Sequence, residues 1–549
     1  MEAVAFLFVL FAIIALVAAA RQSARRQREA EWQRQQAERR RVEECGEVVL
    51  FFANHLGYIA RQAISREVLA GLIDSGITPA GLAAEIGRRM DEVEGITLGC
   101  HRFEDCQIEV RLPQEYRDRH LYIIGKSGSG KTNLIRNLVF QDLENGAGIG
   151  VLAPEQEMLT EELLPYVPDH RVDDVIYFDP SDPQCPAFNP LYLDDGEDLD
   201  LKVDENLTVF KRAVGETGPR MDEILRQALY ALTGRPGVTL LDLERLLDRT
   251  DPAFRNEVIR TSSDPGLVRF WRDVYPSMPK DAHLPITNRL GRFLHAQSVR
   301  NVLCKPRQSV SFRKAMDSGK VLLFNLSDGL LGEQNSQLLG QLVISKFQLA
   351  AMARASVGKS ERRRFNLYAD EFQTFTGTAA VSYEKLLSRA RKYSLSLTLA
   401  HQQTGQIPRH LLQEILGNVS TTVCFQVSRE DALRLSKEMV SEYNGELITV
   451  PPEEILRLRV GQAYCKVGQS AFLMHTKLAD QSPNHKRTRF IIGQARRNYG
   501  LPALPAPAVN GHAGESAAEA ARPASPAQVP ARRAASVLDD LDPGTIFDN

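Results

Sequence analysis

The feature that most restricts the fold of this chain is an unbroken glycine-rich phosphate-loop pattern at residues 125–132. Its members are Gly125, Lys126, Ser127, Gly128, Ser129, Gly130, Lys131 and Thr132. The apolar residues 121–124 precede the loop and helix-forming residues 133–139 follow it, which is the strand, loop, helix order that such a loop needs. The glycines let backbone N–H groups surround phosphates, Lys131 reaches the outer phosphates, and the Thr132 hydroxyl ligates Mg²⁺. The pattern therefore predicts a site for ATP and Mg²⁺.

A second apolar strand, residues 365–369, ends in the acids Asp370 and Glu371. In a strand of this kind the aspartate holds Mg²⁺ through water, and the glutamate polarises the attacking water. For this segment alone, a strand end that is acidic by chance is an equal alternative. Its pairing with the loop at Lys131 favours the catalytic interpretation.

A third strand, residues 395–400, leads directly to Gln402. Because ligands of open α/β sheets bind at the carboxyl edge of the strands, we expect Gln402 to lie beside the acidic pair and to contact the γ-phosphate. A polar strand end without a role is the alternative.

The first residues of the chain predict a membrane anchor. Residues 3–20 are uninterruptedly apolar, about the length that a helix needs to cross ~30 Å of hydrocarbon. The segment that follows, residues 21–41, holds eight arginines against three glutamates, whereas Glu2 leaves the N-terminus without a positive charge. Positive flanks stay in the cytoplasm, so we expect a single membrane span, with the N-terminus outside and the body cytoplasmic. A cleaved signal peptide is the alternative.

Strands that alternate with helices predict an α/β fold: a RecA-like P-loop core with a doubly wound, mainly parallel sheet and an inserted all-α domain. The predicted domains are the transmembrane anchor (1–20), a basic juxtamembrane helix (21–44), a small helical subdomain (45–95), the first part of the core (96–194), the all-α insertion (195–312), the second part of the core (313–495) and a disordered Ala/Pro-rich tail (496–549).

Composition narrows the possible partners only slightly. The net charge is -2, so any basic path for nucleic acid must be local. The seven cysteines lack CxxC or zinc spacing, which is typical of reduced thiols.

The motifs together resemble a known family. They include the lone apolar span, the phosphate loop, Ala-Phe-Asn-Pro-Leu at residues 187–191, the helical insertion, the acidic strand followed by Phe372, and an arginine-containing run at residues 388–393 before Gln402. This combination resembles the type IV coupling proteins of conjugation, in the HerA/FtsK branch of ring-forming DNA motors, over about residues 95–480.

The resemblance implies a hexameric ATPase that binds DNA in a central channel. Such a motor passes DNA, often with an attached relaxase, to the components of a secretion channel. By position, the resemblance implies that Lys131 and Thr132 bind the phosphates and Mg²⁺ and that Asp370 binds the metal. It further implies that Glu371 activates the hydrolytic water and that Gln402 contacts the γ-phosphate.

The resemblance also bears on three further residues. Arg391, or its neighbour Arg389, is similar in placement to an arginine that reaches the nucleotide of an adjacent subunit, and an exposed helix residue is the alternative. Many relatives carry Asp-Pro where this chain has Ala153-Pro154, and Glu155 is the candidate substitute for that acid.

Two other functions remain open at this stage. One is a membrane-tethered relative of HerA or FtsK that acts in defence or segregation, which neighbouring genes would distinguish. The other is a membrane scaffold that uses nucleotide as a switch. The presence of Glu371 argues against the scaffold, because a pure binder does not need a hydrolytic glutamate.

Overall fold

The computed structural model describes residues 2–504, apart from 104–105, 195, 214–217, 308–309, 444–445 and 479–483. Within helices and strands, the side chains of 2–14, 103, 106, 212–213, 378–379, 442–443 and 446 are also outside the description. Residues 1–504 form one compact unit. The predicted tail from 505 onwards lies outside the described residues.

An eleven-stranded sheet forms the centre of this unit, in the order β2-β1-β13-β12-β9-β3-β8-β7-β4-β6-β5. The strands are β1 (Gly95–Phe103), β2 (Cys106–Pro113), β3 (Leu121–Ile124), β4 (Gly148–Ala153), β5 (Val175–Phe178), β6 (Val321–Asn325), β7 (Phe365–Ala369), β8 (Leu395–His401), β9 (Thr421–Cys424), β12 (Gln462–Val467) and β13 (Ser470–His475). From β9 to β5 all pairs are parallel, whereas β2, β1, β13 and β12 extend the sheet with antiparallel pairs. This arrangement confirms the predicted fold class.

Both faces of the sheet are buried, because alternate residues of each strand point to opposite sides. In β3, Leu121 and Ile123 belong to one hydrophobic core, and Tyr122 and Ile124 belong to the other. Such near-continuous apolar strands are typical of a parallel sheet that is covered on both faces. The sheet is therefore doubly wound, as predicted.

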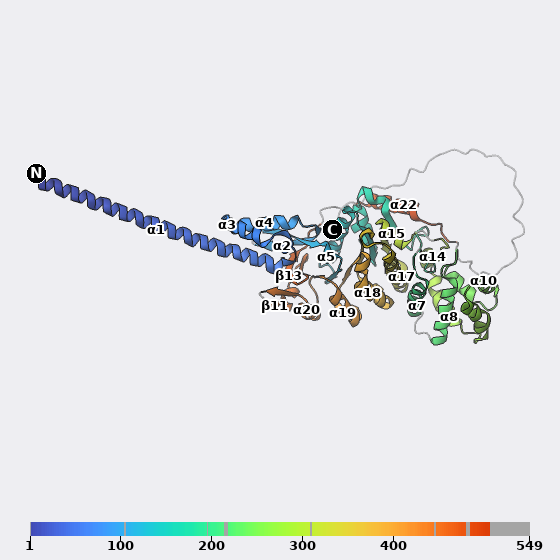
Figure 1. Ribbon diagram of the computed structural model, residues 1–549. Coiled ribbons are helices and arrows are strands. Elements are labelled where there is room, and N and C mark those ends of the chain that lie inside the picture. The colour runs from blue at the N-terminus through green and yellow to red at the C-terminus, as the bar shows by residue number, and fades with distance from the viewer. Residues whose placement is uncertain are drawn as a thin grey trace, which may run out of the picture. The chain divides into compact units, whose positions relative to one another are not determined.

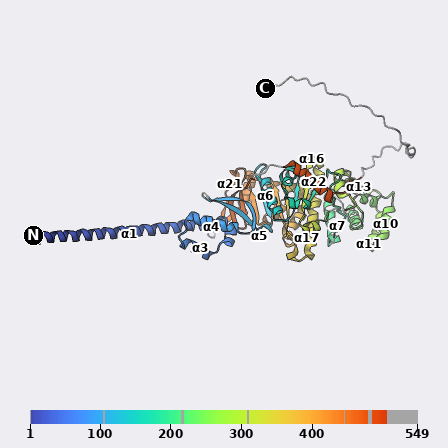
Figure 2. The ribbon, with the colours of Figure 1, turned by 90° about the horizontal axis from the view of Figure 1, so that it is seen from above.

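Helices cover the two faces and form the insertion (Figures 1 and 2). They are α1 (Glu2–His55), α2 (Gly57–Ala63), α3 (Arg66–Asp74), α4 (Pro79–Asp91), α5 (Gln114–Arg117), α6 (Lys131–Glu144), α16 (Asp328–Leu331), α17 (Glu333–Ala353), α18 (Thr376–Arg389), α19 (Arg409–Asn418), α20 (Arg429–Ser436), α21 (Pro452–Leu456) and α22 (His485–Tyr499). A separate two-stranded sheet consists of β10 (Val440–Tyr443) and β11 (Glu446–Thr449). The last helix, α22, extends past the predicted start of the tail at residue 496.

Every described regular element between β5 and β6 is helical. These helices are α7 (Leu199–Ala213), α8 (Pro219–Leu232), α9 (Leu241–Leu247), α10 (Ala253–Thr261), α11 (Pro265–Arg269), α12 (Tyr275–Ser277), α13 (Leu284–Leu294), α14 (Gln297–Leu303) and α15 (Phe312–Ser318), with one π-helical turn at Phe270–Val274. Figure 1 shows α7, α8 and α10 gathered together. Their core is continuous with that of one sheet face, through residues such as Phe188 and Phe312 that pack against Phe324 and Phe178 of the strands.

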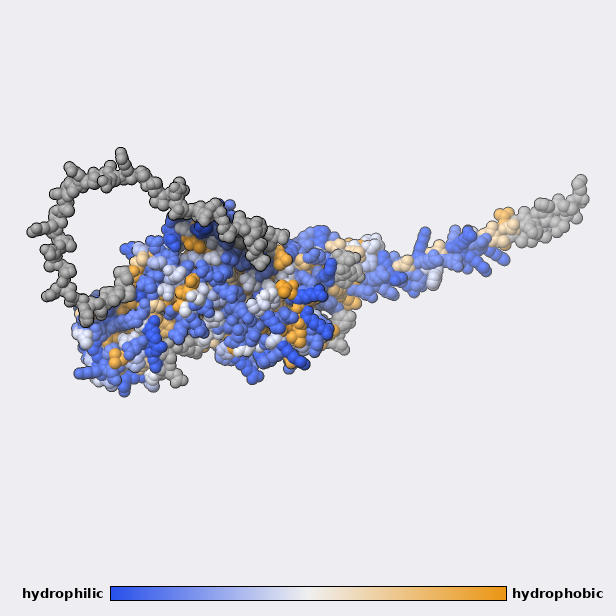
Figure 3. Space-filling view, turned by 180° about the vertical axis from the view of Figure 1, so that it is seen from behind, coloured by the Kyte–Doolittle hydropathy of each residue, from blue (hydrophilic) through white to orange (hydrophobic). Residues whose placement is uncertain are grey.

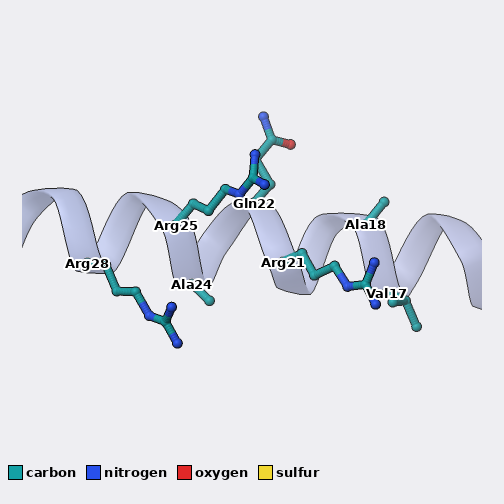
Figure 4. Close-up of a pocket in the computed structure, with 7 residues that line it drawn as sticks. All are labelled: Val17, Ala18, Arg21, Gln22, Ala24, Arg25 and Arg28. Carbon is teal, nitrogen blue, oxygen red and sulfur yellow. The ribbon is translucent and has the colours of Figure 1, made fainter.

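Helix α1 is continuous from the predicted anchor through the predicted juxtamembrane segment and ends at His55. Its last turns are buried at Cys45, Val48 and Phe52. Figure 3 shows the change along this helix from hydrophobic side chains to hydrophilic ones, and Figure 4 shows Arg21, Arg25 and Arg28 just after Val17 and Ala18. Over the residues described, no helix has a stretch long and apolar enough to span a membrane. Residues 3–14 of the predicted anchor lie outside the described side chains.

A buried polar network joins four elements of the core, namely α5, α6, β7 and β8. The Arg117 guanidinium forms an ion pair with Asp142 of α6 at 3.1 Å and donates to Tyr368 of β7 at 2.6 Å and to Thr398 of β8 at 3.1 Å. Tyr368 and Asn366 of β7 also donate to the Asp142 carboxylate. The network fixes α5 and α6 against the neighbouring strands β7 and β8.

His120 holds the beginning of β3 against β8. Its Nε2–H donates to the Leu387 carbonyl at 3.1 Å, and its Nδ1 accepts from the Leu397 N–H at 3.1 Å, so both nitrogens require the neutral ring. Burial, followed by the positive charges of Arg117 and Arg391, lowers the pKa of His120 to about 4.

We expect acid to destabilise the fold through His120. Because the folded pKa lies below the unfolded value near 6.5, this stability is complete above pH 6.5 and is lost as the pH falls towards 4, by about 2 kcal/mol at pH 5. His120→Gln should reduce the difference between the thermal unfolding temperatures at pH 7 and pH 5, and the exposed control His170→Gln should not. An unchanged pH dependence in His120→Gln would contradict the assignment.

Candidate functional site

The glycine-rich loop links β3 to α6 at the carboxyl edge of the parallel strands. Its backbone is attached to both neighbouring strands: the Gly125 N–H donates to the His401 carbonyl at 3.3 Å, and the Lys126 N–H donates to the Gln426 carbonyl at 2.9 Å. Gly125 has no room for a side chain, because a Cβ there would lie 2.5 Å from the Phe425 Cβ and 2.8 Å from the Ser129 Oγ. The loop therefore has a defined position relative to the strands that carry the other candidate residues.

Lys131 is the first residue of α6, and its side chain is buried. The ammonium donates to the carbonyls of Gly125 at 2.8 Å and Lys126 at 3.2 Å, and lies 3.7 Å from the Glu371 carboxylate. The lysine thus folds back over the loop. The structure brings together the lysine of the loop and the glutamate of the acidic strand, which are 240 residues apart in the chain.

Glu371 occupies a strained turn that directly follows β7. Its φ of 41° lies in the left-handed region, which non-glycine residues seldom adopt outside functional sites. The carboxylate accepts hydrogen bonds from Gln402 Nε2 at 3.0 Å and from Gln373 Nε2 at 2.7 Å. Gln402, on the neighbouring strand end, therefore lies within direct contact of the predicted catalytic base.

The predicted metal ligand Asp370 is buried beside Glu371. Burial, and then the Glu371 charge, raise the pKa of Asp370 to about 7, and the charge of the exposed Glu155 contributes to the same shift. Carboxylates placed so close together need a cation nearby if they are to stay ionised. Glu155, two residues after Ala153, thus lies near enough to act on this group.

The donor atoms at this edge fit Mg²⁺. The Asp370 carboxylate and the exposed Thr132 hydroxyl are hard oxygen donors, which Mg²⁺ prefers. Among the described residues, no group of three or more His, Cys, Asp or Glu side chains could hold a metal ion. Mg²⁺ that arrives with a nucleotide does not require such a group, because phosphate oxygens and water complete its coordination.

Three buried aromatic residues to which the sequence analysis gave no role pack behind the site. The Tyr122 hydroxyl lies 2.6 Å from His401 Nε2, and the Phe372 ring meets the His401 ring edge-on at 5.0 Å. Burial lowers the pKa of His401 to about 3, so the ring is neutral and shares one hydrogen bond with the Tyr122 hydroxyl. Because Phe372 follows Glu371 and His401 precedes Gln402, this packing fixes the spacing between the two catalytic candidates.

The polar loop after Gln402 is also held by a residue far away in the chain. Asp431 of α20 is buried and accepts from the Thr404 N–H at 3.2 Å and from the Thr404 hydroxyl. Arg434, one turn further on, donates to the same hydroxyl at 2.9 Å. Neither residue belongs to a recognisable motif.

The predicted arginines do not reach this edge within the chain. Arg389 ends α18 and Arg391 lies in the following 3₁₀ turn, so both precede β8, at the amino edge of the sheet. Gln402 follows β8, which at about 3.3 Å per residue spans roughly 20 Å. Both arginines are exposed. Any contact with nucleotide would have to involve another subunit.

The fold and the loop geometry are those of the P-loop NTPase class. The strand β8 lies between the loop strand β3 and the acidic strand β7, as in RecA-like cores. No protein-family model and no curated protein matches the chain.

Several solved structures resemble it in fold. The plasmid coupling protein TrwB in complex with the GTP analogue GDPNP has a TM-score of 0.47 and 18% identity, over 69% of this chain and 89% of that one. The structure of TrwB in complex with ADP and Mg²⁺ has a TM-score of 0.47 and 17% identity, over 68% of this chain and 89% of that one. The structure of VirB4 of Thermoanaerobacter pseudethanolicus has a TM-score of 0.47 and 16% identity, over 72% of this chain and 98% of that one. At these values the likeness carries no inference about what the present chain binds or does.

The loop offers a matched pair of glycine substitutions. Gly125→Ala forces its Cβ against Phe425 and should cost about 1–3 kcal/mol of stability and displace the loop. Gly128→Ala meets open space and has only the strain of its φ of 72°, roughly 1 kcal/mol. We expect nucleotide affinity to fall much further in Gly125→Ala, as measured by calorimetry, with thermal unfolding as the companion measurement. Equal losses in the two variants would contradict the steric argument.

Proposed function

We propose that this chain is an inner-membrane ATPase of the coupling-protein type, which hydrolyses ATP to move DNA towards a type IV secretion or conjugation channel. The observation that carries the enzymatic part is the convergence of Lys131, Glu371 and Gln402 at one strand edge. Nucleotide binding alone needs the lysine but has no use for a carboxylate that is held beside it in a strained turn.

The contacts of Glu371 suggest how turnover begins. The Glu371 carboxylate lies 3.7 Å from the Lys131 ammonium and is its ionic partner. In our proposal, the γ-phosphate of a bound ATP replaces the carboxylate as the ionic partner of Lys131. The Glu371 carboxylate is then available to accept a proton from the attacking water. Gln402 keeps the carboxylate in place during this exchange. The water oxygen bonds to the γ-phosphorus as the bond to the ADP oxygen breaks, and ADP and phosphate result.

We therefore expect Glu371→Gln to separate binding from hydrolysis. Removal of the carboxylate frees Lys131 and removes a repulsion with the γ-phosphate, so ATP affinity should rise about three- to tenfold. Turnover should fall about 100-fold or more, because no base remains to accept the proton of water. Equilibrium binding and steady-state phosphate release measure the two effects. Glu333→Gln, an exposed glutamate on α17, is the control. Wild-type turnover in Glu371→Gln would refute the assigned base.

The DNA part of the proposal rests on the resemblance of the motifs and on a local basic surface. Four exposed basic residues precede the neighbouring strands β7 and β8, namely Arg363, Arg364, Arg391 and Lys392. This surface is locally basic although the net charge of the whole chain is -2. DNA should therefore stimulate ATP hydrolysis in the full-length protein, and high salt should abolish the stimulation. A nucleotide-switched scaffold would bind ATP with no such turnover. Neighbouring genes for a relaxase and a secretion channel distinguish conjugation from defence or segregation.

We propose further that Arg391 acts on the nucleotide of an adjacent subunit in a hexameric ring. Its exposure and its place at the edge opposite to its own loop support this role. A subunit with Lys131→Ala cannot use its own site, and one with Arg391→Ala cannot complete that of its neighbour. Mixtures should regain part of the hydrolysis that each variant lacks alone, as measured by phosphate release. Arg389→Ala, at the alternative candidate, is mixed with Lys131→Ala in the same way, so that the two arginines can be compared. No recovery in demonstrated mixed assemblies would exclude the role.

The anchor is also a proposal. The apolar residues 3–20 and the arginines that follow on the same continuous helix α1 support a single span with the body in the cytoplasm. A periplasm-dependent reporter fused after Ala60 should be inactive, and carbonate should leave the protein in the membrane. A soluble chain cleaved near Ala20 would restore the signal-peptide alternative.

A further inference from the structure

The contacts of Lys131 and Glu371 set the direction in which a bound nucleotide must lie. If the proposed function holds, the γ-phosphate sits beside Glu371 and Gln402, at the ends of β7 and β8. Both strands lie on one side of β3, and β9 and β12 lie on the other. A triphosphate that follows the loop from its γ end therefore carries its nucleoside towards the β9 and β12 side.

Two loops border the first turn of α6 on that side. The Gly461 N–H, just before β12, donates to the Ser129 carbonyl at 3.0 Å. The Lys477 carbonyl, just after β13, accepts from Asn133 Nδ2 at 2.8 Å and from Asn137 Nδ2 at 2.6 Å. The two loops are also joined to each other, because the Thr476 N–H donates to the Gly461 carbonyl at 2.8 Å. Gly461, Thr476 and Lys477 thus attach the described parts of both loops to the phosphate loop and its helix.

Each of these loops exposes one aliphatic side chain next to its point of attachment. Val460 precedes Gly461 and is 79% exposed, and Leu478 follows Lys477 and is 81% exposed. They are the two most exposed of the large hydrophobic side chains that the structure describes. Both side chains therefore present apolar surface to water beside the phosphate loop, and a ligand bound there would remove that surface from water.

We propose that Val460 and Leu478 form the subsite for the nucleobase of the bound triphosphate. Each side chain offers aliphatic surface to the flat face of a base, and the hydrogen bonds of Gly461 and Lys477 keep both at the end of the loop where the nucleoside emerges. The closeness of the loops is visible at Gly130, where a Cβ would lie 3.5 Å from the Gly461 Cα. This inference rests on the proposed nucleotide site and adds the residues that hold its base.

The subsite has a consequence for base selection. Aliphatic side chains contact adenine and guanine equally well, whereas strong discrimination requires buried hydrogen-bonding groups that match one base. ATP and GTP should therefore bind with affinities within about threefold of each other. The phosphates, held by Lys131 and the loop, should contribute most of the affinity.

The test compares ligands with and without a base. Non-hydrolysable ATP and GTP analogues and inorganic tripolyphosphate, each with Mg²⁺, are titrated into the full-length protein in detergent. Val460→Ser and Leu478→Ser should each lower the affinity for both nucleotides about fivefold, and the double variant about twentyfold, because less apolar surface is covered on binding. Tripolyphosphate affinity should stay within about twofold of wild type. Leu447→Ser, 74% exposed on β11, is the matched control and should change nothing.

Three results would overturn the subsite. The first is an unchanged nucleotide affinity in the double variant. The second is a loss of tripolyphosphate affinity as large as the loss of nucleotide affinity, which would mean that the phosphate loop itself is disturbed. The third is a preference of the wild-type protein for one base by more than about tenfold. Failure of the proposed nucleotide site gives a different result. In that case wild-type protein binds none of the three ligands, or Lys131→Ala binds them as well as wild type does.

Discussion

The site depends on a single buried carboxylate. Asp142 lies near the end of α6, and Arg117, Asn366 and Tyr368 all direct hydrogen bonds to it. It therefore fixes the helix that begins at Lys131 against β7, the strand that leads to Glu371. An uncompensated charge at such a place costs several kcal/mol, so the pairing has little freedom to shift. The contact thereby joins the two elements that carry the lysine and the glutamate.

Much of the core was predictable because its signals are local. The loop around Lys131, the acidic end of β7 and the strand before Gln402 each have a residue pattern tied to their chemistry, and parallel strands necessarily place their carboxyl ends at one edge. The helical insertion follows from long stretches of helical periodicity without strand patterns. These inferences needed no contact between distant residues.

The remaining features arise from contacts that the chain order conceals. The antiparallel strands β12 and β13 were missed, although the alternate burial of Ala463, Cys465 and Val467 is visible as a period of two. The Tyr122 hydroxyl that reaches His401, and the Asp431 carboxylate that holds Thr404, join segments tens to hundreds of residues apart, and no local pattern marks them. The left-handed turn at Glu371 likewise depends on its surroundings, because the residue itself disfavours it.

The separation of Arg391 from Gln402 by the length of β8 has a consequence for assembly. If the arginine serves an adjacent nucleotide, each subunit offers one surface as donor and a different surface as acceptor, which is a heterologous, head-to-tail interface. Such contacts close into a ring only when the rotation between neighbours divides a full turn, and otherwise they continue as a filament. A damaged subunit then impairs the neighbour on one side and spares the neighbour on the other. Each ring or filament would therefore have a polarity, and the hydrolysis of mixed assemblies would depend on which neighbour is damaged.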